Sequence, residues 1–419
     1  MKFVTELECI KCGRGYVPEP DRYLCDECGE TGLLDVKYDY EKIEAEWSKE
    51  DLAQDSRQNI WRYGPLLPIK PETTRPLLRV GHTPLYRNSE LAEALGLNNL
   101  LIKSDGLNPT GSLKDRASAV AVVKAQEADN STVACSSTGN AASSLAGNAA
   151  SFPGKMDTVI FVPERAPEGK LAQLLIYGAT VVKVKGSYEE TYELSAAAIE
   201  RWGWYNRNAA INPYMVEGKK TCVLEMAEQL DFELPDWLVF SVGDGCTIAG
   251  AGKALKDLRA INLLDREVKL LGVQAEGCDP ITRSFHTGES LEVQNENTIA
   301  DSIAVGKPRN FHKALSAVEN SGGTMVNVSD EEIQEMMRLL GSKTGIFGEP
   351  AGAAGLAGIR RAVKEGEISP EARVGFVVTG NGLKDIDNAL KAAPAPLEVE
   401  PDMAQLQDKF MQRGIVSEK

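Results

Sequence analysis

The chain has 419 residues, of which 42% are hydrophobic and 26% are charged, a balance typical of globular proteins with room for two or three domains. Its net charge of −15 disfavours phosphate backbones and anionic lipid, so we expect neither nucleic-acid nor membrane partners. No apolar run is long enough to span a membrane, and acidic residues come too early for a signal peptide, so we expect a cytoplasmic location. The eight cysteines should then be thiols or metal ligands rather than disulfides.

Two Cys-x-x-Cys pairs open the chain, Cys9 with Cys12 and Cys25 with Cys28, and a glycine follows each pair. This spacing predicts a zinc ribbon in which four thiolates hold one structural Zn²⁺. Four cysteine ligands leave no open coordination position, so we expect the metal to be non-catalytic. The alternatives are free thiols or a redox pair, although a redox pair would stand alone beside a strand–helix unit.

A lysine is expected at the start of a helix further along the chain. The apolar run 100–102 predicts a buried strand, and a turn follows at 108–111, where proline fixes φ and glycine tolerates a positive φ. We expect Ser112 to be the N-cap of a helix that continues beyond Asp115. Lys114 then lies in the first turn, where the helix dipole lowers the pKa of its amine, as an imine-forming lysine requires. An ordinary surface lysine is the alternative.

Strands and helices alternate after this turn, which predicts parallel, doubly wound sheets. One loop between a strand (132–135) and a helix offers hydroxyls and backbone N–H groups that could cradle an anion, although a well-capped helix is the simpler alternative. This loop consists of Ser136, Ser137, Thr138, Gly139 and Asn140. A second loop follows the strand predicted at 236–242 and is, by itself, a weak phosphate signal. It consists of Gly243, Asp244, Gly245, Cys246 and Thr247.

Two strings resemble those of a known family. Residues 106–116, Gly-Leu-Asn-Pro-Thr-Gly-Ser-Leu-Lys-Asp-Arg, resemble the cofactor-lysine motif of the fold-type II pyridoxal-phosphate (PLP) enzymes in their threonine synthase branch, with Leu113 where Phe is usual. Residues 379–385, Thr-Gly-Asn-Gly-Leu-Lys-Asp, resemble a string particular to that branch. Some of its members also carry an N-terminal ribbon.

The resemblance implies an α/β fold with two doubly wound parallel-sheet domains plus a small N-terminal zinc ribbon, in a homodimer. The expected parts are a ribbon at 1–40, a larger PLP domain from 41–104 and 213–392, a smaller domain at 105–212 and a C-terminal tail at 393–419.

The resemblance also implies residue roles. Lys114 would bind PLP covalently and act as acid and base. Asn140 would contact the 3-hydroxyl of PLP, and Thr379 would contact its ring nitrogen. The loop Gly243–Thr247 would hold the cofactor phosphate, and the loop Ser136–Asn140 would hold the carboxylate of an amino-acid substrate.

The implied reaction is γ-elimination of phosphate from O-phospho-L-homoserine followed by addition of water, which gives L-threonine. Three positions depart from the branch pattern: Ala141, Thr247 and Met215, the last replacing an arginine that binds the substrate phosphate. The candidate replacements for this arginine are Lys219, Lys220 and Arg309. The alternative is β-elimination or β-replacement on a serine- or threonine-like amino acid, as in ammonia-lyases or cysteate synthase-like enzymes. A nucleic-acid module on a retired PLP fold is a further alternative, against which the acidic charge and the intact Lys114 stand.

Overall fold

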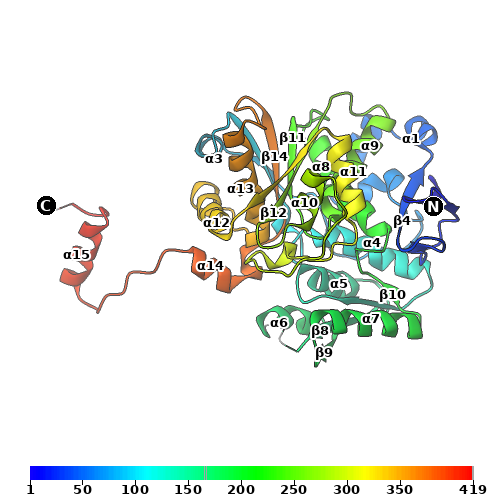
Figure 1. Ribbon diagram of the computed structural model, residues 1–419, viewed down its shortest axis with the longest axis horizontal. Helices are drawn as coiled ribbons and strands as arrows, with labels where there is room; N and C mark the ends of the chain where they lie inside the picture. Colours follow the sequence, from blue (N-terminus) through cyan, green and yellow to red (C-terminus); the bar gives the residue numbers. More distant parts are fainter. Residues whose placement is uncertain (165, 167, 418–419) are drawn as a thin grey trace.

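Among the residues that the computed structural model describes (1–164, 166 and 168–417), the strands form three separate sheets (Figure 1). The N-terminal sheet is antiparallel and has the order β2-β1-β4-β3. Its strands are β1 (Val4–Cys9), β2 (Gly15–Tyr16), β3 (Leu24–Cys25) and β4 (Gly29–Tyr38). One Cys-x-x-Cys turn connects β1 to β2 and the other connects β3 to β4. This is the geometry of the predicted ribbon.

The second sheet is entirely parallel and has the order β10-β7-β8-β9. Its strands are β7 (Thr132–Ser136), β8 (Asp157–Pro163), β9 (Thr180–Val184) and β10 (Tyr205–Asn206). Helices connect them, so their carboxyl ends meet at one edge.

The third sheet has six strands in the order β13-β12-β11-β14-β6-β5. They are β5 (Leu85–Arg87), β6 (Asn99–Ser104), β11 (Trp237–Ser241), β12 (Lys269–Ala275), β13 (Thr324–Val328) and β14 (Arg373–Val378). All neighbours pair in parallel except β5, which is antiparallel to β6. The α/β architecture is confirmed, with the correction that this sheet is mixed: β5 and β6 flank the short helix α3, which is too short to carry the chain back for a parallel pairing.

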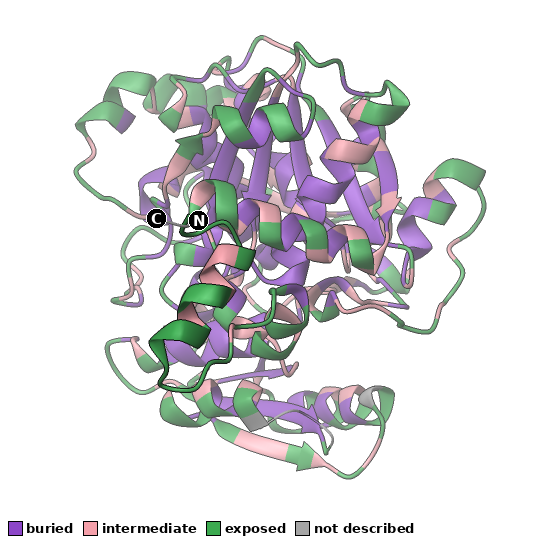
Figure 2. Cartoon of the chain, turned by 90° about the vertical axis from the view of Figure 1, so that its left-hand side faces the viewer, coloured by how far each residue is buried: buried purple, intermediate pink, exposed green. Residues whose placement is uncertain are grey.

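Helices cover both faces of this sheet, so its central strands are buried on both sides (Figure 2). Ile102, Val239 and Phe376 on three neighbouring strands are all fully buried, as the continuous apolar character of these strands predicts. The longer helices are α4 (Lys114–Glu127), α5 (Asn140–Ala150), α6 (Glu168–Ile176), α7 (Tyr188–Trp202), α8 (Tyr214–Gln229), α9 (Cys246–Ala260), α11 (Phe311–Asn320), α12 (Asp330–Thr344), α13 (Pro350–Glu365) and α15 (Met403–Gln412). The shorter helices are α1 (Tyr40–Glu46), α2 (Lys49–Gln54), η1 (Ile60–Leu66), α3 (Ser89–Ala94), η2 (Asp105–Leu107), α10 (Pro280–Thr287), η3 (Asp301–Ile303), η4 (Gly382–Lys384) and α14 (Ile386–Ala392).

The N-terminal sheet packs on α8 and α9 through buried polar contacts. Tyr38 Oη donates to Glu217 Oε2 (2.6 Å), and Lys253 Nζ donates to the Val36 carbonyl (2.7 Å). Each of these groups would be costly to bury without its partner. The ribbon is therefore held against α8 and against α9, the helix that begins directly after the Gly243–Gly245 loop.

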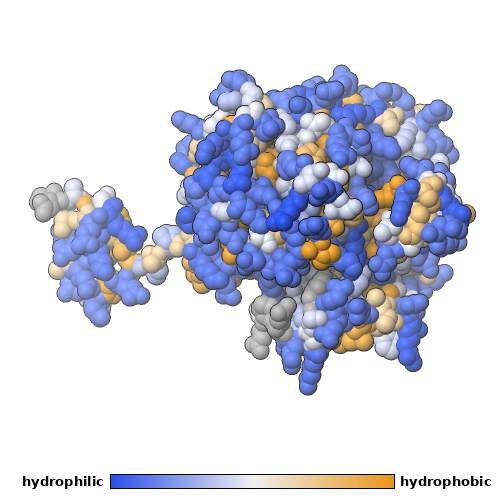
Figure 3. Space-filling view, in the orientation of Figure 1, coloured by the Kyte–Doolittle hydropathy of each residue, from blue (hydrophilic) through white to orange (hydrophobic). Residues whose placement is uncertain are grey.

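The C-terminal segment extends away from the rest of the chain and ends in α15 (Figures 1 and 3). No residue of α15 is buried. In the part of the chain described by the structure, every helix is too short or too polar to cross a membrane.

Candidate active site

The carboxyl ends of the parallel strands bring distant loops together around a cavity of about 240 Å³. Its walls come from the start of α4, the loop after β7, the loop after β11 and the residue after β14. Most of the residues predicted for the cofactor and the substrate line it. They are Lys114, Ser136, Ser137, Asn140, Gly243, Asp244, Gly245, Cys246, Thr247 and Thr379. Thr138 and Gly139 instead line a smaller cavity of about 70 Å³, which shares Asn140 and Glu349 with the first.

Lys114 is the first residue of α4, as predicted, but Ser112 is not its cap. The N-cap position is Leu113, without a side-chain hydrogen bond, and Ser112 Oγ is buried with no partner among the described residues. Burial and then the positive charges of Lys219 and Arg207 lower the pKa of Lys114 to about 7. The pKa of this amine is therefore lowered mainly by burial and by neighbouring cations, whereas the sequence analysis attributed the lowering to the helix dipole.

Glu349 is a site residue that the sequence did not single out. It is buried at the start of α13, and its Oε1 accepts a hydrogen bond from Asn140 Nδ2 (2.7 Å). Burial raises the pKa of Glu349 to about 7, against the opposing effect of the Lys114 charge. The cavity thus holds an amine and a carboxyl that both titrate near neutrality, which is a pattern typical of acid–base sites. The sequence signal for Glu349 was its position in a string that resembles the family segment Glu-Pro-Ala. A glutamate at this position could equally be interpreted as a helix cap.

Two backbone hydrogen bonds join the starts of α4 and α13 to the segment that follows β14. The Leu113 N–H donates to the Thr379 carbonyl (2.8 Å), and the Glu349 N–H donates to the Gly380 carbonyl (3.1 Å). The residue before Lys114 is therefore fixed to the residue that follows β14. This contact brings together two strings that are more than two hundred residues apart in the sequence.

The glycines of the loop after β11 are required by close packing. A Cβ atom at Gly243 would lie 2.9 Å from Ile303 Cα, and Gly245 has φ +91° with a would-be Cβ 2.8 Å from Ala314 Cβ. The helix α9 begins directly afterwards and has no side-chain N-cap. Its first-turn N–H groups are therefore available to an anion.

Asp244 and Cys246 have structural contacts inside this loop. The Asp244 carboxylate accepts from the Arg309 N–H (2.8 Å) and from Cys246 Sγ (3.1 Å). Burial raises the pKa of the Cys246 thiol to about 11. Its low acidity argues against a role as a nucleophile.

Two cations, Arg207 and Lys219, line the cavity and are almost fully buried, at 2% and 4% exposure. Arg207 donates through Nε and Nη2 to Ser118 Oγ (both 3.1 Å). Among the described side chains, no carboxylate forms an ion pair with either cation. Burial lowers the pKa of each, because a buried cation without a counter-charge is unfavourable.

The structure separates the three candidate replacements for the missing arginine. Lys219 and Arg309 line the cavity, and Arg309 also stacks over the Tyr192 ring at 4.2 Å. Lys220 is wrong as a candidate, because it is fully buried in ion pairs with Glu217 and Asp257. Met215 is itself fully buried in the core, outside the cavity lining.

These features fit a phosphorylated cofactor. The cavity combines an uncapped helix N-terminus, a glycine loop, two unpaired buried cations and a lysine with a lowered pKa. The hydroxyls of Ser136 and Ser241 also line it and are buried without a hydrogen-bond partner among the described residues. A bound molecule with several polar groups would satisfy them.

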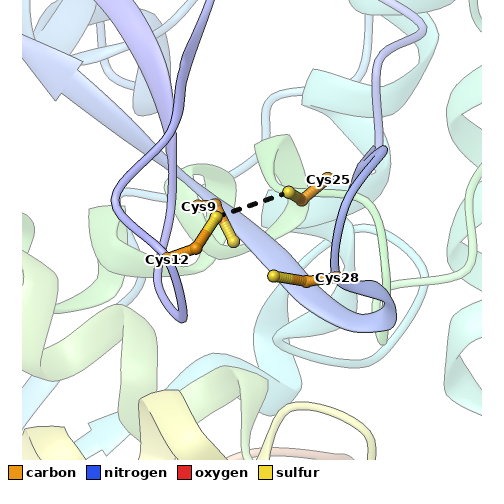
Figure 4. A group of neighbouring side chains, drawn as sticks. All are labelled: Cys9, Cys12, Cys25 and Cys28. Carbon is orange, nitrogen blue, oxygen red and sulfur yellow. Dashed lines mark hydrogen bonds between the residues drawn. The ribbon is translucent and has the colours of Figure 1, made fainter.

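The four N-terminal cysteines converge on one point (Figure 4). Their sulfur atoms all lie within 4.8 Å of one another, and Cys12 Sγ is 3.7 Å from Cys25 Sγ. Tetrahedral coordination with Zn–S bonds of about 2.3 Å would separate the sulfurs by about 3.8 Å. The cluster can therefore hold a metal ion.

Comparisons with known proteins agree with this site. The family described as "Pyridoxal-phosphate dependent enzyme" matches residues 77–380. The threonine synthase of Methanocaldococcus jannaschii is 40% identical over 94% of this chain and 96% of its own length, and that of Methanosarcina acetivorans is 37% identical over 96% and 98%. Maize serine racemase has the same fold, with a TM-score of 0.63 at 20% identity over 80% of this chain and 92% of its own.

The chain belongs to the family of pyridoxal-phosphate-dependent enzymes with the fold-type II architecture, and it is a PLP-dependent lyase. Within that family its relatives support the threonine synthase type.

Proposed function

We propose that the enzyme converts O-phospho-L-homoserine and water into L-threonine and inorganic phosphate. The bond from Cγ to the phosphate oxygen breaks and phosphate departs with the bonding electrons. Water then supplies a hydroxyl to Cβ, and protons are redistributed between Cα, Cβ and Cγ. PLP, held by Lys114, would supply the electron sink for the carbanions formed in this sequence.

Lys114 would move the protons. With a pKa of about 7, its amine has both the neutral and the charged form available at neutral pH, which suits a group that accepts and returns protons in turn. Glu349 would hold Asn140 in place through the 2.7 Å hydrogen bond. The loop Ser136–Asn140 would bind the substrate carboxylate.

The single observation that carries the substrate assignment is the pair of buried, unpaired cations, Arg207 and Lys219. A buried cation needs a counter-anion, and a cofactor phosphate together with a substrate phosphate would supply two. We propose that Lys219 replaces the arginine lost at Met215 in binding the substrate phosphate. Arg309, already engaged with Tyr192 and near Glu189, would be an outer contributor.

The test is a steady-state assay of the purified holoenzyme with O-phosphohomoserine, threonine, serine and O-phosphoserine. Phosphate, threonine and ammonia are measured separately. Threonine and phosphate in equal amounts from O-phosphohomoserine would support the proposal. The absence of threonine at millimolar substrate, with ammonia released from serine or threonine, would refute it and favour the β-elimination alternative, to which the changes at Ala141, Met215 and Thr247 point.

We further propose that Cys9, Cys12, Cys25 and Cys28 bind structural Zn²⁺ and that the enzyme is a cytoplasmic homodimer. Thiolates arranged for a metal suit a reducing compartment. We also keep the division into a larger domain (41–104 and 213–392) and a smaller one (105–212). Elemental analysis, light scattering and limited proteolysis test these points.

A further inference from the structure

A second and larger cavity, of about 940 Å³, lies between the ribbon, α9 and α11. These elements lie side by side (Figure 1), and buried hydrogen bonds join them: Lys253 of α9 and Lys313 of α11 donate to the carbonyls of Val36 and Leu34. None of the residues that line this cavity lines the active-site cavity. It is therefore a separate feature of the molecule.

Helical spacing brings several polar side chains to each wall of the cavity. On α9, Lys253, Lys256 and Arg259 recur every third residue and share a face. On α11, Ser316 and Asn320 lie one turn apart. Lys313 and His312, at the start of α11, also line the cavity.

The charge of this cavity opposes that of the whole chain. Five cationic side chains line it, from Lys11, Lys253, Lys256, Arg259 and Lys313, against a single carboxylate. The chain itself has a net charge of −15. Such a local excess of positive charge focuses potential toward anions.

The single carboxylate, Asp35, neutralises only the inner part of this cluster. It lies 3.6 Å from Lys253 and 3.9 Å from Lys313. Although burial opposes its ionisation, these two cations lower the pKa of Asp35 to about 2. Lys256 and Arg259 have no ion-pair partner among the side chains that the structure describes, so the outer part of the cluster is free to bind an anion.

We propose that this cavity is a binding site for a small organic polyanion. Phosphate or paired carboxylate groups would bind Lys256 and Arg259, and the organic part would lie against Val216, Ala249 and Leu255, which also line the cavity. The volume lies within the range of about 300–1,000 Å³ common for small-molecule sites. The anion would lie between the ribbon, which contributes Lys11 to the lining, and α9, the helix that begins at the proposed cofactor loop.

Isothermal titration of the holoenzyme at low ionic strength tests this site, with pyrophosphate, AMP and citrate as probes. Pyrophosphate and AMP report phosphate recognition, and citrate reports carboxylate recognition. The double variant Lys256→Glu/Arg259→Glu should bind the preferred probe at least tenfold more weakly, since it loses two charge-assisted contacts. The matched control is Arg201→Glu/Lys364→Glu, which makes the same charge change at exposed positions outside the cavity lining. It should bind within about twofold of wild type, because distant exposed charges are screened.

Three results would overturn the proposal. The first is that no probe binds the wild type at millimolar concentration. The second is an equal loss of binding in the double variant and in the control. The third is binding that persists in the double variant but is lost in Lys219→Met, which would locate the probe in the active site. None of these results depends on whether the enzyme makes threonine.

Discussion

Replacing Lys219 by methionine tests the proposed role of this lysine in binding the substrate phosphate. Methionine keeps the volume and the apolar stem of lysine but removes the charge. A charge-assisted hydrogen bond contributes about 1.5–3 kcal/mol, which corresponds to about a 10- to 150-fold change in binding. We expect kcat/KM for O-phosphohomoserine to fall by this factor, mainly through a higher KM. Inhibition by inorganic phosphate should weaken in parallel.

The same substitution should not destabilise the apoenzyme. Lys219 is 4% exposed and has no ion-pair partner among the described residues. Its buried charge therefore destabilises the folded apoenzyme until an anion binds. Denaturant unfolding of the apo variant should therefore give a free energy at least equal to that of wild type. Loss of activity through misfolding would appear here as a fall in stability.

The Lys219→Met variant should also change the pH dependence. After burial, Lys219 is the largest cause of the low pKa of Lys114, so its removal should raise that pKa above about 7. Activity that requires the neutral amine should then appear at higher pH than in wild type. The exposed Lys364→Met variant is the control and should match wild type throughout. An unchanged KM together with loss of bound PLP, seen as loss of visible absorbance, would refute the assignment and give Lys219 to the cofactor phosphate.

Three further predictions concern the cofactor lysine, the buried carboxyl and the ribbon. Wild type should be yellow and should retain a pyridoxyl group on Lys114 after borohydride reduction, whereas Lys114→Ala should lose turnover altogether; mass spectrometry that finds the group on another lysine would contradict this. Glu349→Gln keeps the hydrogen bond from Asn140 but removes a negative charge that favours the ammonium form of Lys114. The acidic limb of the kcat profile should therefore move to lower pH, opposite to the shift in Lys219→Met. A shift in the same direction would show that the two charges do not act on this amine. Cys12→Ser should bind less than one metal per chain and melt several degrees lower; a variant with full zinc content and wild-type melting would exclude Cys12 as a ligand.

The sequence predicted those features that are encoded within one continuous segment. The strand before the lysine turn, the helix start at Lys114 and the cysteine knuckles each depend on neighbouring residues, and the structure has them as expected. The structure also has a capping box between Ser329 and Glu332 at the start of α12, which is another local Ser-x-x-Glu pattern. The prediction that Ser112 caps α4 was wrong, because a tertiary contact, the hydrogen bond from Leu113 to Thr379, fixes the start of α4 without a side-chain cap.

Features that depend on contacts between distant segments could not be predicted from the sequence. Glu349 becomes an acid–base candidate only because α13 brings it against Asn140 and away from water. Arg207 gave no signal, since its lack of a carboxylate partner is a property of the folded surroundings. The cavity proposed to bind a polyanion is likewise formed only where the ribbon, α9 and α11 come together.

The choice between Lys219 and Lys220 shows how the fold selects one of two identical neighbours. Successive residues on a helix point about 100° apart, so only one of them can face the cavity. Lys220 is fixed on the opposite side by ion pairs with Glu217 and Asp257, and Tyr38 of the ribbon donates to the same Glu217. Lys219, the preceding residue, lines the cavity. If the ribbon holds the proposed zinc, removal of the metal would loosen the Tyr38 contact and thereby weaken binding of the proposed substrate phosphate, although the metal is remote from the chemistry.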